Sequence, residues 1–249
     1  MHPDGTVTVL TGTSPHGQGH ATAWAMLASE HLGVPIEMIT VRHGDTDLVP
    51  RGAGTMGSRS LQTGGVAVDQ AAAELVELAK QRAADVLEVA VDDLEVAEGA
   101  VRVRGTDASV MLGRLAESEP LRTEATFDSG APTFPFGAHL AVVEVDVESG
   151  KAVVNKIVTV DDAGPVLNPL IAEGQRHGGI AQGIAQATHL NPLGEKGIGE
   201  AGTIGATPAV QNAVVDAVAH LGVRHIDMPA TPLRVWEAIQ AARESGESS

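Results

Sequence analysis

The sequence predicts an α+β fold built from two α/β subdomains, and three observations support this prediction. Stretches in which apolar and polar residues alternate, as in strands, are mixed with segments of helical character throughout the chain. The chain has 249 residues, enough for two modest domains that each bury a core. An irregular stretch at 105–135, rich in Ser, Thr, Pro and Asp, separates the two halves. We therefore expect a first subdomain over 1–125, a second over 126–242 and a disordered polar tail over 243–249.

The first half alternates strands and helices, and glycine-rich loops join them. Gly33 is typical of a helix C-cap, and Glu98-Gly99 is typical of a hairpin turn. Glycine loops at 17–19 and 51–60 each precede a predicted helix. In chain order, the predicted elements are a strand at 5–12, a helix at 21–32, a strand within 36–46, a helix at about 61–86 and a hairpin at 94–103.

The second half begins with the clearest hairpin pattern in the chain, two alternating strands within 139–162 around a Ser149-Gly150 turn. A glycine-containing helix is expected over 169–188. Thr207 as N-cap, Pro208 at the first helical position and Gly222 after the last turn predict a third element, a helix over about 208–221. A final helix is expected over 232–243.

Composition and charge exclude several classes of function. The formal net charge of −16 argues against a nucleic-acid partner, because such proteins need a basic surface. The absence of cysteine excludes disulfides, thiolate metal sites and iron–sulfur clusters held by this chain. No apolar run approaches the roughly 18–20 residues that span a bilayer, and the N-terminus lacks the pattern of a signal peptide. We therefore expect no membrane partner and a cytoplasmic location.

The stretch TGTSPHGQGHAT at 11–22 contains two histidines four residues apart, His16 and His20. Such a pair binds zinc when both side chains lie on one helix face, but two intervening glycines cost a helix about 2 kcal/mol relative to alanine. The alternative is a turn, Gly17-Gln18-Gly19, that exposes backbone N–H groups at a helix N-terminus and favours an anion. An ordinary strand-to-helix turn also fits this stretch.

Two further stretches carry candidate site residues. In GAGTMGSRSLQTGG at 52–65, backbone amides and the hydroxyls of Thr55, Ser58 and Ser60 could surround a phosphate, with Arg59 adding positive charge. In GEKGIGEAGTIGATPAV at 194–210, Glu200 lies between small residues, and burial would raise its pKa and suit it to act as a general base. Each stretch could equally be a loop with a structural role only.

Five stretches in the same order resemble the molybdopterin-binding large subunit of the xanthine dehydrogenase / aldehyde oxidase / carbon monoxide dehydrogenase family. They are GQGH at 17–20, GTMGSRS at 54–60, FGAHLAVVEVDVESG and its continuation to Ala187, GEKGIGEAG from Gly194, and DMPATPLRVWEAI at 227–239. The resemblance is to the C-terminal half of that subunit and covers nearly the whole chain. It implies a molybdenum hydroxylase, an oxidoreductase that hydroxylates an aldehyde or N-heterocyclic carbon with oxygen from water.

The resemblance also implies a role for particular residues. Glu200 matches the family's base beside molybdenum, and Gln18 matches a residue that hydrogen-bonds the pterin region. Molybdenum is held through the pterin dithiolene, so no residue of this chain is expected as a metal ligand, and His16 and His20 frame a cofactor turn. The residues expected to surround molybdopterin cytosine dinucleotide are Gly17, Gln18, Gly19, His20, Thr55, Met56, Gly57, Ser58, Arg59, Ser60, Gln62, Lys196, Gly197 and Gly199.

The chain also departs from this family in two ways. An N-terminal half with a second cofactor loop and a substrate loop is absent from this sequence, and the connection at 187–196 is shorter than the family's. The resemblance implies activity with further partners: the N-terminal half of the molybdenum subunit, an iron–sulfur subunit with [2Fe-2S] clusters, a flavin subunit with FAD, and a small-molecule substrate. The alternative is a shortened, non-catalytic relative that acts as a cofactor-binding or assembly module.

Overall fold

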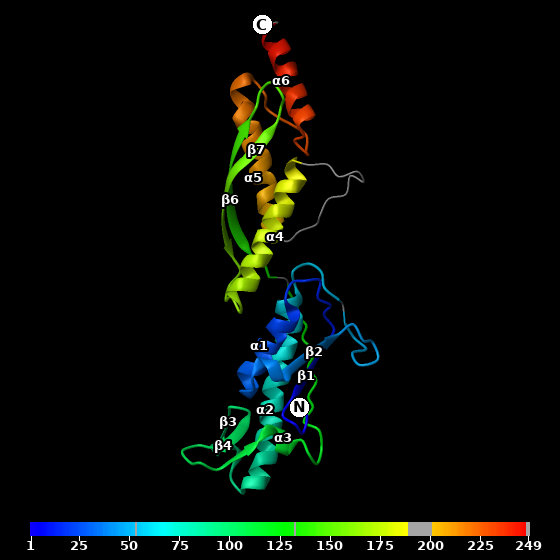
Figure 1. Cartoon of the computed structure of the whole chain (residues 1–249), viewed down its shortest axis with the longest axis vertical. Helices are drawn as coiled ribbons and strands as arrows, with labels where there is room; N and C mark the ends of the chain where they lie inside the picture. The colour runs from blue at the N-terminus through cyan, green and yellow to red at the C-terminus, as the bar shows by residue number, and fades with distance from the viewer. Residues whose placement is uncertain (53, 132, 189–200, 248–249) are drawn as a thin grey trace. The chain divides into compact units, whose positions relative to one another are not determined.

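The computed structural model describes residues 1–52, 54–131, 133–188 and 201–247 (Figure 1). The chain divides into two compact units, Met1–Pro132 and Thr133–Ser249, which we call unit 1 and unit 2. The division lies within the irregular 105–135 stretch. Helices accompany three small open sheets, so the predicted α+β class is confirmed. In the described part of the chain, no helix combines the length and apolar character needed to cross a membrane.

Unit 1 begins with a strand–helix–strand unit. Strand β1 (Val7–Thr11) pairs in parallel with β2 (Ile39–His43), and helix α1 (His20–Leu32), followed by a 3-10 turn at Ile36–Met38, connects them. Helix α1 ends where predicted, because Gly33 adopts a left-handed conformation and its N–H donates to Ser29 O at 2.8 Å. Parallel pairing places the ends of β1 and β2, and the loops that follow them, at the same edge of the sheet.

The rest of unit 1 encloses its core. A π-helical turn (Leu61–Gly65) leads into α2 (Val66–Leu87), which packs on α1, and a 3-10 turn at Val91–Asp93 follows. Then come β3 (Leu94–Ala97), β4 (Ala100–Val103), β5 (Ser109–Met111) and α3 (Leu112–Leu115). The predicted hairpin is confirmed, with positive φ at both Glu98 and Gly99. Strand β5 was not predicted, because its three residues fall in the stretch that reads as irregular. The core includes the fully buried Leu32, Leu94, Val101, Leu112 and Leu121.

Unit 2 consists of a long hairpin and three helices. Strands β6 (Phe136–Val145) and β7 (Ala152–Asp162) pair antiparallel, as predicted, with one register shift at Val142/Val143. Helix α5 (Ala201–Val218) packs on β6, and helix α4 (Pro169–Thr188) packs on α5. Val214, Val218, Val235 and Ile239 form the centre of the core. The helices are α4 (Pro169–Thr188), α5 (Ala201–Val218) with a 3-10 turn at Ala219–Leu221, and α6 (Pro232–Glu247).

Two predicted helix boundaries in unit 2 are wrong. Helix α5 already includes Ala201, and Pro208 lies inside it rather than at its first position. The Thr207 hydroxyl donates to Thr203 O at 2.8 Å inside the helix instead of capping its start. Tertiary contact with α4 thus outweighs the local start signal. Helix α6 continues past Arg243 to Glu247, beyond the predicted end.

Helices α4 and α5 meet through small residues. A Cβ at Gly179 would lie 3.2 Å from Gly202 Cα, and a Cβ at Gly183 would lie 2.8 Å from Ala206 Cβ. The Thr203 hydroxyl donates to Gly179 O at 2.7 Å across the same contact. These glycines therefore set how closely the two helix backbones approach each other.

Matched glycine substitutions in α4 test this contact. We expect Gly183→Ala to lower the free energy of unfolding by about 1–3 kcal/mol, because the added methyl group has no room. Gly178→Ala should raise it by up to about 1 kcal/mol, because a Cβ there meets nothing within 4 Å and alanine favours the helix. Urea unfolding followed by circular dichroism measures both. Equal effects of the two substitutions would contradict the close packing.

Candidate functional site

The candidate site lies in unit 1, where two glycine loops follow the ends of the parallel strands. The first loop, residues 12–19, joins β1 to α1, and the second, residues 51–60, precedes the helical turn at Leu61–Gly65. The two backbones touch: a Cβ at Gly12 would lie 2.6 Å from Gly52 Cα, and a Cβ at Gly52 would lie 2.5 Å from Gly12 O. Only glycine at both positions allows this approach. Ligands bind in open α/β folds at this edge, beyond the carboxyl ends of the strands.

Thr55 joins the two loops by hydrogen bonds. Its Oγ1 accepts from the Ser14 backbone N–H at 3.1 Å and from the Ser60 hydroxyl at 3.4 Å. The Gly54 N–H adds a bond to Gly12 O at 3.2 Å. The sequence predicts that the hydroxyls of Thr55 and Ser60 surround a phosphate. In the structure, Thr55 Oγ1 holds the first loop against the second, and the Ser60 hydroxyl donates to Thr55 within the second loop.

Trp24 packs against the first loop and against the helical turn that follows the second loop. Its indole is fully buried and its Nε1–H donates to Thr13 Oγ1 at 3.1 Å, and Thr13 Oγ1 also lies 3.0 Å from Thr11 Oγ1. A Cβ at Gly64 would lie 2.6 Å from Thr13 Cγ2, so this glycine lets the helical turn pack on the first loop. Sequence reasoning missed Thr13 and Trp24. An apolar aromatic residue one turn into a helix carries no signal that distinguishes it from ordinary core.

No side chain among the described residues caps the N-terminus of α1. Its N-cap, Gly19, has a left-handed conformation and makes no side-chain cap. The carbonyl oxygen of the Gln18 side chain accepts from the His16 backbone N–H, which orders the turn in front of the helix. An uncapped helix N-terminus concentrates N–H donors and partial positive charge, and it therefore favours a bound anion.

His20, the first residue of α1, is buried against Trp24. His20 is 6% exposed, and the centroids of the His20 and Trp24 rings lie 5.2 Å apart. Burial lowers the pKa of His20 below its usual 6.5, and the nearby His16 and His43 lower it further. Its Nδ1 is buried and has no hydrogen-bond partner among the residues that the structure describes. A bound polar group would satisfy this atom.

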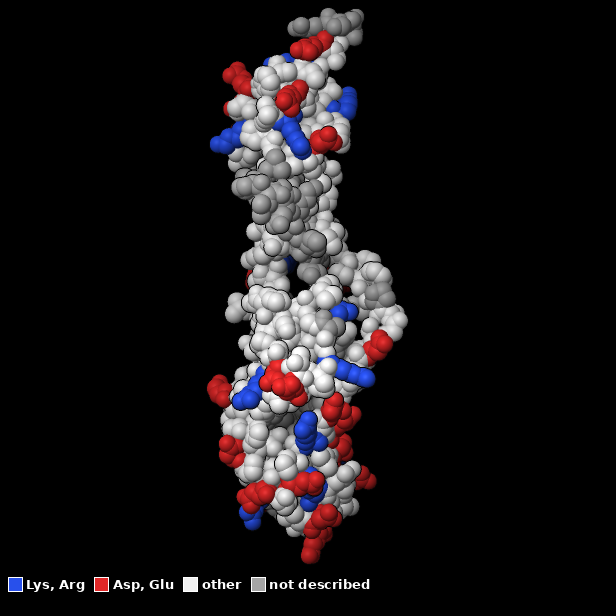
Figure 2. Space-filling view, turned by 90° about the vertical axis from the view of Figure 1, so that its right-hand side faces the viewer, with Lys and Arg blue, Asp and Glu red and all other residues white. Residues whose placement is uncertain are grey.

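The charge of the two loops differs from that of the whole chain. The chain carries a formal net charge of −16, yet residues 12–19 and 51–60 contain Arg51 and Arg59 and no carboxylate, and Asp45 and Asp47 stand earlier in the segment that follows β2. Neither arginine forms an ion pair with another described residue. On the face of unit 1 drawn in Figure 2, by contrast, acidic and basic side chains are mixed. The loops thus offer an environment suited to an anionic ligand.

The structure brings together the residues predicted from the first two stretches. Gly17, Gln18, Gly19 and His20 lie in the first loop and at the start of α1. Thr55, Met56, Gly57, Ser58, Arg59 and Ser60 lie in the second, and the Gln62 side-chain amide donates to Ser58 O at 3.1 Å. Met56 is 58% exposed, and Gly57 and Ser58 are also exposed. Lys196, Gly197, Gly199 and Glu200 lie outside the described residues.

Comparison with known proteins identifies the family. Residues 1–192 match the family described as "Molybdopterin cofactor-binding domain". The chain belongs to this family. The molybdopterin-binding domain is also 33% identical to the carbon monoxide dehydrogenase large chain of Hydrogenophaga pseudoflava, over 96% of this chain and 36% of that one. It is 32% identical to the 6-hydroxypseudooxynicotine dehydrogenase complex subunit gamma of Paenarthrobacter nicotinovorans, over 97% of this chain and 37% of that one.

Solved structures show the same fold. The molybdopterin-binding domain matches a reconstituted CO dehydrogenase from Oligotropha carboxidovorans with a TM-score of 0.84 and 31% identity, over 98% of this chain and 37% of that one. It matches quinoline 2-oxidoreductase from Pseudomonas putida 86 with a TM-score of 0.80 and 31% identity, over 96% of this chain and 37% of that one. The chain therefore corresponds to part of a large subunit and spans little more than a third of the relatives it matches. The resemblance inferred from the sequence is confirmed.

The loop residues fit the cofactor for which the family is named. Molybdopterin carries a phosphate, and the loops provide an uncapped helix N-terminus, two arginines and no carboxylate. The buried Nδ1 of His20 needs a polar partner that no described residue supplies. Gly17, Gly54 and Gly57 have open space where a Cβ would lie, so a ligand can approach the backbone there.

The hydrogen bonds of Thr55 generate the first prediction about this site. We expect Thr55→Val to reduce the retained molybdenum several-fold, because valine keeps the shape but leaves the Ser14 N–H without its acceptor. Elemental analysis of the purified protein measures the metal. Thr106→Val is the control, because the Thr106 hydroxyl bonds only within its own turn, to Val103 O and the Ala108 N–H. Equal retention in the two variants would contradict the role of Thr55.

The lowered pKa of His20 generates a second prediction. Folding favours the neutral ring, so its contribution to stability is complete above the ordinary pKa of 6.5 and is lost as the pH falls below that value. In the cofactor-free chain, His20→Phe removes this titration and keeps an aromatic ring against Trp24. Urea unfolding between pH 7.5 and 5.5 should show a smaller loss of stability in His20→Phe than in the original chain. An equal loss in both would contradict the burial of a neutral His20.

Proposed function

We propose that this chain is the cofactor-holding part of a molybdenum hydroxylase, an oxidoreductase that hydroxylates a small aldehyde or N-heterocycle with oxygen from water. The observation that carries the proposal is the pair of loops joined at Gly12–Gly52 and Ser14–Thr55 beside an uncapped helix N-terminus. The relatives support the reaction class through their names, which include nicotine 6-hydroxylase, xanthine dehydrogenase and aldehyde oxidoreductase. Carbon monoxide dehydrogenase large chains are also among them.

We assign binding of the cofactor to unit 1. The amides at the start of α1, together with Ser58, Arg59 and Ser60, hold the phosphate-containing part of molybdopterin cytosine dinucleotide. Gln18 and His20 supply hydrogen bonds to the pterin side of the ligand. When bound, the cofactor carries molybdenum on its dithiolene and accepts two electrons from the substrate. No side chain of this chain is proposed as a metal ligand.

Glu200 is proposed as the base, and Lys196, Gly197 and Gly199 as cofactor neighbours. The support is the sequence, in which Glu200 stands between Gly199 and Ala201 in the segment that resembles the family's glutamate segment. A carboxylate held in a water-poor site has a raised pKa and can remove a proton from the oxygen that attacks the substrate carbon. Its sequence neighbours, Gly199 and Ala201, carry little side-chain bulk.

The complete enzyme is proposed to need other polypeptides. The chain spans 36% of the Hydrogenophaga large chain, so the remaining part of a molybdenum subunit is the first expected partner. Electrons that leave molybdenum would pass to an iron–sulfur subunit with [2Fe-2S] clusters and a flavin subunit with FAD. The name of the Paenarthrobacter relative, subunit gamma of a dehydrogenase complex, is consistent with such an assembly.

A single preparation of the assembled complex tests this function. We expect about one molybdenum and one CMP, the latter released by acid, for each copy of this chain. We further expect Glu200→Gln to lower kcat by about 10²–10⁴-fold with both contents unchanged, because glutamine cannot accept the proton.

Glu195→Gln is the matched control, because Glu195 lies in the same segment and has no proposed catalytic role. Unchanged turnover in Glu200→Gln would show that Glu200 is not the base. The absence of molybdenum and CMP from the complete assembly would instead favour a non-catalytic assembly module.

A further inference from the structure

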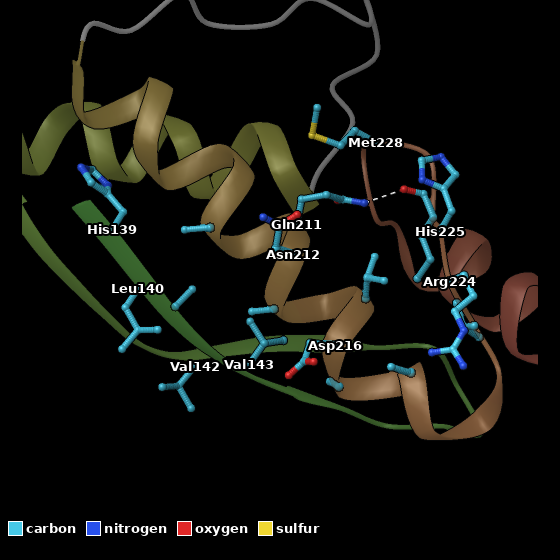
Figure 3. Close-up of a pocket in the computed structure, with 18 of the residues that line it drawn as sticks. His139, Leu140, Val142, Val143, Gln211, Asn212, Asp216, Arg224, His225 and Met228 are labelled. Atoms are coloured by element: carbon cyan, nitrogen blue, oxygen red, sulfur yellow. Dashed lines mark hydrogen bonds between the residues drawn. The ribbon is translucent and has the colours of Figure 1, made fainter. Parts of the chain in front are cut away.

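A groove of about 1070 Å³ lies within unit 2, and none of the candidate cofactor residues that the structure describes lines it (Figure 3). Its walls come from His139–Val143 of β6, from residues of α5 between Ala209 and Ala217 with Ala219 of the following 3-10 turn, and from the irregular segment 223–228. The polar residues on its wall carry both signs of charge, with Asp216 and Asp227 opposing Arg224. The groove is therefore close to neutral.

The groove runs along the edge of β6 rather than over one face of the hairpin. Five consecutive β6 residues line it, and no residue of β7 does. Consecutive residues of a strand point to opposite faces. Figure 3 shows His139 and Val143 on the side of β6 that faces α5, and Leu140 and Val142 on the other side. A groove that is lined by both faces of β6 and by no residue of β7 must therefore follow the free edge of β6.

This edge is long and has few features that would prevent pairing. Among the described residues this sheet has two strands, so β6 pairs with a strand on one side only. Its ten residues include no lysine and no proline, and Glu144 is its one carboxylate. Pairing with β7 is regular from Phe136 to Val142, before the register shift. Natural proteins protect a free edge with charge, proline or a covering segment, and this edge has an apolar surface in which Leu140 is 63% exposed.

Two buried polar atoms on the groove wall lack partners among the described residues. They are Nδ1 of His139, whose side chain is 4% exposed, and Oε1 of Gln211. Their other polar atoms are already used, since His139 Nε2 bonds Asp161 Oδ1 at 2.9 Å and Gln211 Nε2 donates to Ile226 O at 2.6 Å. A polypeptide backbone in the groove offers both N–H and C=O groups to satisfy them.

We propose that an extended segment of the rest of the molybdenum subunit adds to β6 as a third strand in this groove. The length of the related large chains indicates the occupant. This chain covers 36–37% of the large chains it matches, although 97–98% of it matches their fold. A free edge in this part of a larger subunit is completed most directly by that subunit's remaining part. The inference rests on the proposed function for the identity of the partner.

Site-specific photo-cross-linking tests the occupant. We would replace Leu140 with p-benzoylphenylalanine, produce the chain in its own host and identify the adduct by mass spectrometry. We expect an adduct with a polypeptide similar to the part of the Hydrogenophaga large chain that this chain does not span. The same replacement at Val160, an exposed residue on β7 outside the groove, should give much less of it. An adduct with a second copy of this chain, with an unrelated protein, or with nothing would overturn the proposal.

Charged substitutions test the edge itself. We expect the pair Leu140→Lys and Val142→Lys to weaken retention of the cross-linked partner at least about tenfold, because lysines on an edge oppose strand addition. Val158→Lys with Val160→Lys is the matched control on β7, and its retention should stay near that of the original chain. Circular dichroism confirms that both variants keep the hairpin. Equal retention in the two variants would overturn the proposal.

These experiments distinguish a failure of the docking groove from a failure of the proposed hydroxylase function. Molybdenum and CMP are measured in the same complexes, independently of the cross-link. A captured large-subunit segment in a complex without molybdenum would support the docking groove and contradict the hydroxylase function. A complex that contains molybdenum but gives no adduct at position 140 would contradict the groove alone.

Discussion

The close approach of two backbones at Gly12 and Gly52 is the constraint on which the candidate site depends. A methyl group on either residue would meet the other backbone at about 2.5 Å, so the loops can touch only as glycines. Their contact allows the Ser14 N–H to reach Thr55 Oγ1 and places the second loop beside the uncapped start of α1. The parallel β1–β2 pair provides the common edge from which both loops leave. Donors from two separate stretches thereby lie together, and we propose that they serve one anionic ligand.

Glycine has a second use in unit 2, where it sets helix packing rather than loop contact. Gly179, Gly183 and Gly202 bring α4 and α5 close together, and Gly205 leaves room for the His139 ring. His139 is thus held between α5 and Asp161 of β7, and it fixes the hairpin against the helix. The inner face of the hairpin packs on α5 within the unit, while Leu140 and Val142 on the outer face of β6 are exposed. This asymmetry is why the chain fits a part of a larger subunit.

The sequence predicted the fold class, both hairpins and the first two loops, because alternation, turn residues and glycine clusters are local signals. It misplaced the start of α5, because Thr207 and Pro208 form a convincing local start that the α4 contact overrides. It missed Trp24 and Thr13, whose role arises only once α1 packs beneath the loops. It also missed the β6 groove, because an unfilled edge is a property of the sheet and not of the strand's own pattern. The assignment of Glu200 remains a prediction from the sequence.

Amide hydrogen exchange shows whether the two loops hold the cofactor. The assembled complex would be compared with and without molybdopterin cytosine dinucleotide, peptide by peptide. We expect the cofactor to slow exchange at residues 14–22 and 54–62, which comprise the two loops and the first turn of α1, and to leave the β3–β5 sheet of the same unit unchanged. Slower exchange elsewhere in unit 1, with both loops unaffected, would contradict the assignment of cofactor binding to these loops.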